Sequence, residues 1–61
     1  MKLRELMTVI VDDVIIYTEV GDGIYNDIYS GRYRDVPQEL LEREVRLVGV
    51  GRRKKLDIEV F

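Results

Sequence analysis

The sequence contains no cysteine and no histidine, and it has only one proline. Without cysteine, the chain can form neither a disulfide nor a thiolate metal site. Without histidine, it lacks the commonest metal ligand of proteins and the usual general base near neutral pH. Its acidic residues do not match the spacing of a calcium loop, and its glycines do not continue into a phosphate-binding motif. We therefore expect no metal site, no cofactor and no enzymatic activity.

Long apolar runs are also missing, since none approaches the roughly 20 residues that cross a membrane. The start of the chain is not expected to be a signal peptide, because Glu5 interrupts it and no cleavage site of small residues follows. A cytoplasmic protein is therefore the expectation. Ten basic and twelve acidic residues give a net charge of −2, which makes nucleic-acid binding an unfavoured function.

The chain has 61 residues, of which 46% are hydrophobic and 36% are charged. This composition is typical of a folded protein, because disordered chains combine low hydrophobicity with high net charge. The length predicts one domain over residues 1–61, and such a domain buries only about 60% of the surface that its unfolded chain exposes. Small domains without disulfides or metals often gain stability by oligomerising. We therefore expect a homo-oligomer.

The first half of the chain predicts a helix followed by a β-hairpin. Apolar residues recur at helical spacing over residues 2–10, which predicts a short amphipathic helix. Residues 14–20 are rich in β-branched side chains and predict a strand. Gly21-Asp22-Gly23 is a turn signal because both glycines tolerate positive φ, and residues 24–30 then form the returning strand.

The second half repeats this order. Asp35 can cap a helix start, with Gln38 three residues later and Pro37 in the first turn, so we expect a helix over residues 36–43. Residues 45–50 and 55–61 alternate as strands around a turn at 51–54. The expected fold class is α+β: a four-stranded, mostly antiparallel sheet with two short helices, in the order αββαββ.

The main candidate binding surface is a tyrosine stripe, formed by Tyr17, Tyr25, Tyr29 and Tyr33. All four positions have the same parity, and same-parity side chains of a strand point to one face. Tyrosine suits interfaces because it combines a large contact area with a polar tip. The stripe, together with Phe61, is expected to bind a second copy of the chain or a foreign partner. The alternatives are that the helices cover this face and make it core, or that the tyrosines line a wet surface.

A second candidate is the basic run at the predicted turn of the last hairpin. It consists of Arg52, Arg53, Lys54 and Lys55. The ordinary interpretation is a solvated turn whose charges protect strand edges from aggregation. The functional interpretation is a secondary electrostatic contact with an acidic partner or a phosphate. Combined with stacking on the tyrosines, this turn gives the alternative function, a small nucleotide or nucleic-acid binder.

Several segments of the chain resemble a group of short proteins that phages and integrated elements of Gram-positive bacteria encode. The segments are Leu3-x-x-Leu6, Asp12-Asp13-Val14-Ile15-Ile16, Ile28-Tyr29-Ser30-Gly31, Asp35-Val36-Pro37-x-Glu39-Leu40-Leu41-x-Arg43-x-Val45 and the final Leu-x-Ile-x-Val. This resemblance implies a protein that acts by binding, and some such proteins block host defences. The expected function is therefore a non-enzymatic, homo-oligomeric binding protein, phage-derived, that binds or inhibits a host protein.

Overall fold

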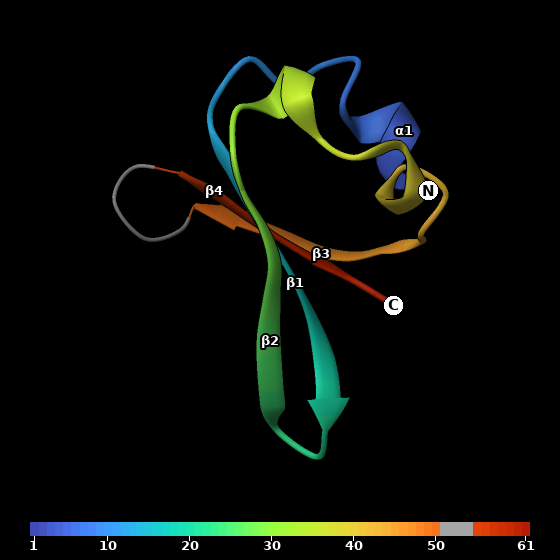
Figure 1. Cartoon of the computed structure of the whole chain (residues 1–61), viewed down its shortest axis with the longest axis vertical. Coiled ribbons are helices and arrows are strands. Elements are labelled where there is room, and N and C mark those ends of the chain that lie inside the picture. The colour runs from blue at the N-terminus through green and yellow to red at the C-terminus, as the bar shows by residue number, and fades with distance from the viewer. Residues whose placement is uncertain (51–54) are drawn as a thin grey trace.

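The computed structural model describes residues 1–50 and 55–61, in which a four-stranded sheet packs against short helical segments (Figure 1). The elements are the helix α1 (Leu3–Leu6), the strands β1 (Val14–Gly21) and β2 (Ile24–Gly31), the 3-10 turns η1 (Tyr33–Asp35) and η2 (Gln38–Leu40), and the strands β3 (Val45–Val50) and β4 (Leu56–Val60). The helical segments gather at one end, and the tip of the β1–β2 hairpin extends away from them (Figure 1). The α+β class is confirmed.

The first hairpin forms where the sequence predicts it. Gly23 adopts a φ of +73°, which an L side chain rarely takes, and its N–H donates to Oε2 of Glu19 at 3.0 Å. β1 and β2 then pair antiparallel from Gly21 opposite Ile24 to Val14 opposite Gly31. The glycine of the turn thus fixes the place at which the chain reverses.

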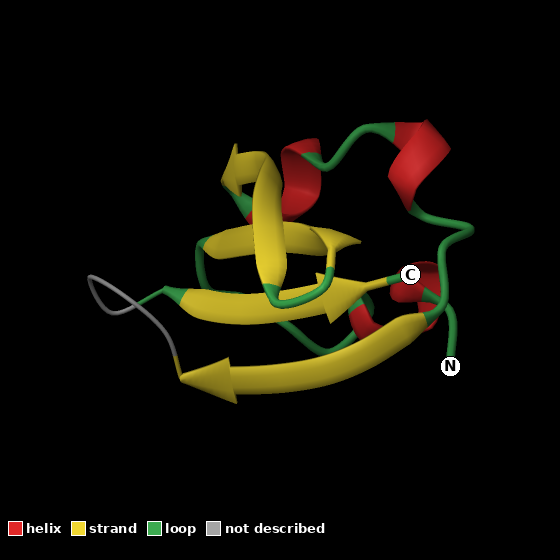
Figure 2. Cartoon of the chain, turned by 90° about the horizontal axis from the view of Figure 1, so that it is seen from below, coloured by secondary structure: helices red, strands yellow, loops and turns green. Residues whose placement is uncertain are grey.

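The order of the strands is β2-β1-β4-β3, and the central pair is parallel. Val14 of β1 lies opposite Leu56 of β4, and Thr18 lies opposite Val60. The two outer pairs are antiparallel, and β3 is the outermost strand on its side (Figure 2). The expectation of a mostly antiparallel sheet is therefore wrong, because the sheet is mixed.

The parallel pair follows from the path of the chain between the hairpins. β2 ends at Gly31, opposite the start of β1, whereas β3 begins at Val45, opposite Val60 at the other end of the sheet. The segment of residues 32–44 therefore runs back along the sheet before β3 begins. As a result β3 points the same way as β2, and β4 points the same way as β1.

This crossing segment and α1 close one face of the sheet and form the core with it. The buried apolar side chains of this core come from the two central strands, β1 and β4, and from the covering segments. They are Leu3, Ile10, Val14, Ile16, Val36, Leu40, Ile58 and Val60. Leu6 and Met7, which share the predicted apolar face of the first helix with Leu3 and Ile10, pack against it. That face is confirmed, although α1 itself is shorter than the predicted helix over residues 2–10.

The predicted helix over residues 36–43 is wrong, because this region contains only the 3-10 turn η2. Its backbone is engaged elsewhere: the N–H of Leu3 donates to the carbonyl of Arg43 at 2.9 Å, and that of Arg4 to the carbonyl of Leu41 at 2.8 Å. A bridge between Lys2 and Glu44 continues this pairing. Within the turn, the N–H groups of Leu40 and Leu41 donate to the carbonyls three residues back, those of Pro37 and Gln38, which is the 3-10 pattern and not the α-helical one.

Candidate functional site

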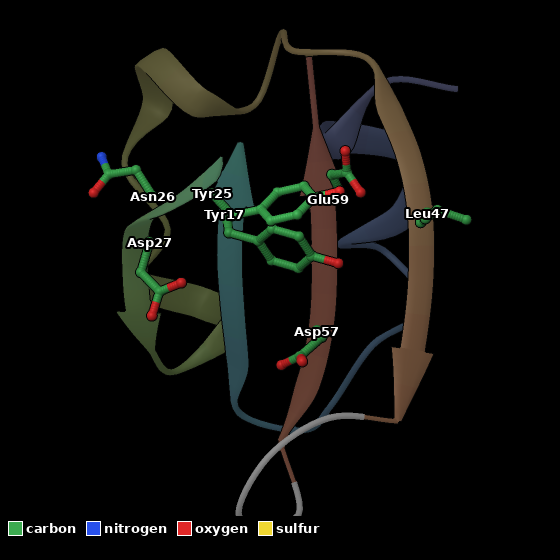
Figure 3. A pocket seen from close by; sticks show the side chains of 7 residues that line it. All are labelled: Tyr17, Tyr25, Asn26, Asp27, Leu47, Asp57 and Glu59. Carbon is green, nitrogen blue, oxygen red and sulfur yellow. The ribbon is translucent and has the colours of Figure 1, made fainter. Parts of the chain in front are cut away.

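The face of the sheet opposite the core is hollowed by an open concavity of about 730 Å³. The rings of Tyr17 and Tyr25 extend over it from β1 and β2, and Asp57 and Glu59 face it from β4 (Figure 3). The complete lining is Tyr17, Tyr25, Asn26, Asp27, Leu47, Asp57 and Glu59. We call this surface the tyrosine–acid concavity.

Strand register brings the two tyrosines together. Tyr17 lies opposite Asp27, and Tyr25 lies opposite Glu19, so the two rings are diagonal neighbours on one face of the hairpin. Their centroids are 5.6 Å apart and their planes meet at 82°, an edge-to-face contact. Such a pair contributes about 0.5–1.5 kcal/mol beyond the area that it buries. Tyr25 nevertheless remains about half exposed, at 52%.

The parallel register of β1 and β4 supplies the acidic side of the concavity. Tyr17 lies opposite Glu59, and Ile15 lies opposite Asp57. Among the described residues that line the concavity, three are acids and none is basic. The site therefore combines aromatic faces with negative charge, and both attract a cation.

Glu59 is a buried charge that a neighbouring strand neutralises. Its side chain is only 3% exposed, and Nη1 of Arg46 lies 3.0 Å from Oε2 of Glu59. The same Nη1 lies 3.4 Å from Oε1 of Glu19 on β1. Arg46 stands at an irregularity of β3 between Val45 and Leu47, where the register to β4 shifts. One guanidinium thus holds carboxylates of two strands at the border of the concavity.

The tyrosine stripe does not lie on one face, and this part of the prediction is wrong. The register shifts in the first hairpin: Ile16 lies opposite Tyr29, but the next residue, Tyr17, lies opposite Asp27. Ile28 is the extra residue of a β-bulge, and one extra residue reverses the parity of all positions beyond it. Tyr25 therefore faces the concavity, whereas Tyr29 packs against the core on the other face.

The surroundings of Tyr29 are those of a core residue. Its hydroxyl donates to the carbonyl of Arg32 at 2.7 Å. Desolvation raises the pKa of Tyr29, and the charges of Asp35 and Asp13 raise it further. A Cβ at Gly31 would lie 2.9 Å from the Tyr29 hydroxyl oxygen, so a larger residue there would require the Tyr29 ring to shift.

Tyr33 and Phe61 lie apart from the two rings of the concavity. Tyr33 belongs to η1 and packs against the core, with the guanidinium of Arg34 at 5.5 Å from its ring centroid. Phe61 follows β4 and is 68% exposed, with the guanidinium of Arg46 at 5.8 Å. Of the five aromatic residues expected to form one surface, the structure brings only Tyr17 and Tyr25 into contact.

The basic turn is described only at its last residue. Arg52, Arg53 and Lys54 lie outside the described residues. Lys55 is half-buried, and its Nζ donates to Oγ of Ser30 on β2 at 3.1 Å. This contact connects Lys55 to the opposite hairpin, and it leaves the electrostatic role of the turn a prediction.

Sequence reasoning missed the acids of the concavity. Asp57 and Glu59 alternate with Leu56, Ile58 and Val60, a pattern that by itself indicates only a strand with one polar face. Only the parallel neighbour β1 places them beside the tyrosines. Within the described part of the chain, no group of three or more acidic side chains is arranged to hold a metal ion.

Comparisons with known proteins add no relative: no family model, curated protein or solved structure matches this chain. The described residues also include no helix with the length and apolar character needed to cross a membrane. Any functional reading therefore depends on the geometry of the chain itself.

Proposed function

We propose that this chain is a non-enzymatic, homo-oligomeric binding protein of the cytoplasm, and that its tyrosine–acid concavity receives a basic side chain of a protein partner. The observation that carries this proposal is the edge-to-face pair of Tyr17 and Tyr25 beside the carboxylates of β4. The rings offer contact area and polar hydroxyls, as in many protein interfaces.

The charge of the lining supports a cationic partner. A lysine or arginine head placed over a tyrosine face gains about 0.5–2 kcal/mol, the larger values applying where water is excluded. Asp27 and Asp57 add carboxylates within the same lining. Glu59 is already held by Arg46, so its role is to keep this border of the concavity ordered.

The same charges count against the alternative function. A nucleic acid would bring phosphates to a lining whose described residues include three acids and no base. The resemblance of the sequence to short phage-encoded proteins favours a host protein as the partner, bound or inhibited through a basic segment. A host defence protein is the example that this resemblance suggests.

A titration followed by nuclear magnetic resonance tests the proposal. The probes are a short lysine- and arginine-containing peptide and a glutamate-containing peptide of equal length. We expect the basic peptide to shift the resonances of Tyr17, Tyr25 and Asp57, and we expect added salt to weaken the effect. Equal shifts with the acidic peptide, or shifts confined to other residues, would contradict the proposed function.

Tyr25→Ala is the matching variant, and Ile24→Ala is its control. Ile24 is exposed at 61% and is the sequence neighbour of Tyr25, but it does not line the concavity. Loss of one aromatic face should weaken binding of the basic peptide by about 3–30-fold, which corresponds to the contribution of a cation–π contact. The Ile24→Ala variant should bind as the unaltered protein does.

A further inference from the structure

The two outer strands of the sheet differ in how they are protected from pairing with another strand. β2 contains the bulge at Ile28 and carries Asp27, and bulges and charges are the usual means of blocking an edge. β3 has its irregularity only near its start, between Val45 and Leu47. From Leu47 to Val50 it has regular register and no charged residue.

The side chains of this part of β3 are apolar and exposed. Leu47 is 56% exposed, Val48 47% and Val50 91%. The side chain of Leu47 points beyond β3, away from the tyrosine rings (Figure 3). An exposed apolar edge strand without charge is a template for a further strand.

The hydrogen bonds at the two ends of β4 show which backbone groups of β3 face outward. The N–H of Leu56 donates toward β1, to the carbonyl of Asp13 at 3.0 Å, and the N–H of Phe61 donates to the carbonyl of Glu44, which precedes β3, at 3.0 Å. Because successive residues of a strand alternate in direction, Asp57 and Glu59 also face β3.

The residues of β3 opposite Asp57 and Glu59 are Gly49 and Leu47, so these two direct their N–H and C=O groups toward β4. Val48 and Val50 consequently direct theirs away from the sheet. On that side, the N-terminal segment pairs with the start of β3, through the Lys2–Glu44 bridge and the bond from the Val45 N–H to the Met1 carbonyl at 2.8 Å. Beyond Val45, no strand of the described residues lies there, since β3 ends the strand order. Val48 and Val50 thus present two donors and two acceptors at the open edge.

These groups are complementary to the same groups of a second copy. In an antiparallel pair centred on Gly49, Val48 lies opposite Val50 of the partner subunit, and Val50 lies opposite Val48 of the partner subunit. Both are then hydrogen-bonded pairs, which gives four backbone hydrogen bonds. Gly49 falls on the twofold axis at the closer, non-hydrogen-bonded position, and a Cβ placed on it meets no atom within 4 Å.

Side chains and charge fit this arrangement as well. Val48 and Val50 lie opposite Ile58 and Leu56, on the core face, so the valines of both copies would continue one apolar surface across the axis. Arg46, the nearest charged residue of β3, already pairs with Glu19 and Glu59. Residues 48–50 of either copy carry no charge, so like charges do not meet at the centre of the pair.

We propose that two copies of this chain pair antiparallel along β3, around a twofold axis at Gly49, and form one continuous eight-stranded sheet. This inference rests on the proposed homo-oligomer and names its surface, which is distinct from the tyrosine–acid concavity. The three residues per strand that pair, 48–50, bury less than the ~800 Å² per partner of a standard interface. The dimer should therefore dissociate on dilution within the micromolar range.

Measurement of mass against concentration tests self-association first. By analytical ultracentrifugation from about 1 µM to about 1 mM, the unaltered chain should pass from monomer to dimer. Val50→Lys should raise the dissociation constant at least tenfold, because a lysine is placed at the open edge. Val50 is 91% exposed, so the circular dichroism spectrum and the melting temperature should not change.

Single cysteines then locate the interface, since the chain has none of its own. Gly49→Cys should form an intermolecular disulfide under mild oxidation, because its partner is directly opposite across the axis. Tyr25→Cys, on the tyrosine–acid concavity, is the matched control and should remain monomeric under denaturing conditions.

The outcomes separate the two levels of the proposal. A chain that remains monomeric over the whole range would overturn both the homo-oligomer and the β3 pairing, while the binding of a basic peptide at the concavity is judged by its own titration. A dimer that persists in Val50→Lys, or that is cross-linked by Tyr25→Cys and not by Gly49→Cys, would overturn the β3 pairing alone.

Discussion

The two faces of the sheet are built from the same strands but differ in what covers them. One face is closed by α1 and by the segment between the hairpins, and its central residues Val14, Ile16 and Ile58 have no exposed surface. No segment of the described residues covers the other face, which holds Tyr17, Tyr25 and the acids of β4 in an open concavity. The path of residues 32–44 therefore decides which face of the sheet becomes the buried core and which face stays exposed.

The largest expected effect is a difference in the free energy of unfolding between two variants, each with one aliphatic side chain truncated on one face of the sheet. Ile58→Ala removes a side chain with no exposed surface at the centre of the core, and we expect a loss of about 2–5 kcal/mol. Leu47→Ala, on the open side, should cost less than about 1 kcal/mol because Leu47 is 56% exposed. Urea denaturation followed by circular dichroism measures both, and equal losses would contradict the division into two faces.

The next comparison concerns the two tyrosines that flank the bulge. Tyr29→Ala should destabilise the protein by about 2 kcal/mol, because its ring packs against the core and its hydroxyl bond to Arg32 is lost. Tyr25→Ala should cost about 1 kcal/mol, mainly through the contact with Tyr17. A larger loss from Tyr25 in the same denaturation experiment would reverse the assignment of the faces.

A smaller effect is expected at the border of the concavity. Arg46→Ala removes the guanidinium from Glu59, and a buried carboxylate without its partner is destabilising. Because Arg46 is itself 46% exposed and solvent screens the pair, we expect only about 1–2 kcal/mol. A second change, Glu59→Gln, should restore part of that stability, and a double-mutant cycle without coupling would contradict the pairing.

The smallest expected effect is a dependence on alkaline pH. The pKa of Tyr29 is raised by desolvation and by nearby carboxylates, so the folded state holds its proton longer than the unfolded state does. Its contribution is complete below about pH 10, the ordinary pKa of tyrosine, and is lost as the pH rises through the folded-state pKa. Tyr29→Phe should therefore lose less stability than the unaltered chain between about pH 9 and about pH 11, measured by denaturation at each pH.

Local signals in the sequence predicted the hairpins but not their association. Gly23 marks the first turn through its positive φ, and the alternation of residues 56–60 marks the last strand. The parallel contact of β1 with β4 depends on where the intervening chain crosses, which no local pattern encodes. The prediction of a helix over 36–43 is also wrong: Val36 and Pro37 have non-helical ψ values of 127° and 140°, and only Gln38–Leu40 form a 3-10 turn.

The sequence pointed to the tyrosines of the candidate site but not to the acids beside them. Tyr17 and Tyr25 do share one face, as their parity predicts, but a register shift between Glu19 and Gly21 lies between them, and the sequence does not show that shift. The bulge at Ile28 arises from pairing with β1 and places Tyr25 and Tyr29 on opposite faces of the sheet. No glycine or proline at this position marks the bulge in the sequence. The sequence contains the acids of β4, but it does not show that β4 lies beside β1 and its Tyr17.

The position of the bulge is the central claim, and nuclear Overhauser effects measured by nuclear magnetic resonance test it most directly. We predict cross-peaks from the ring protons of Tyr29 to methyl groups of the core, and from those of Tyr25 to the ring of Tyr17. A regular hairpin without the bulge would instead place Tyr25 and Tyr29 on one face. The absence of any contact between Tyr29 and a core methyl group would contradict the account.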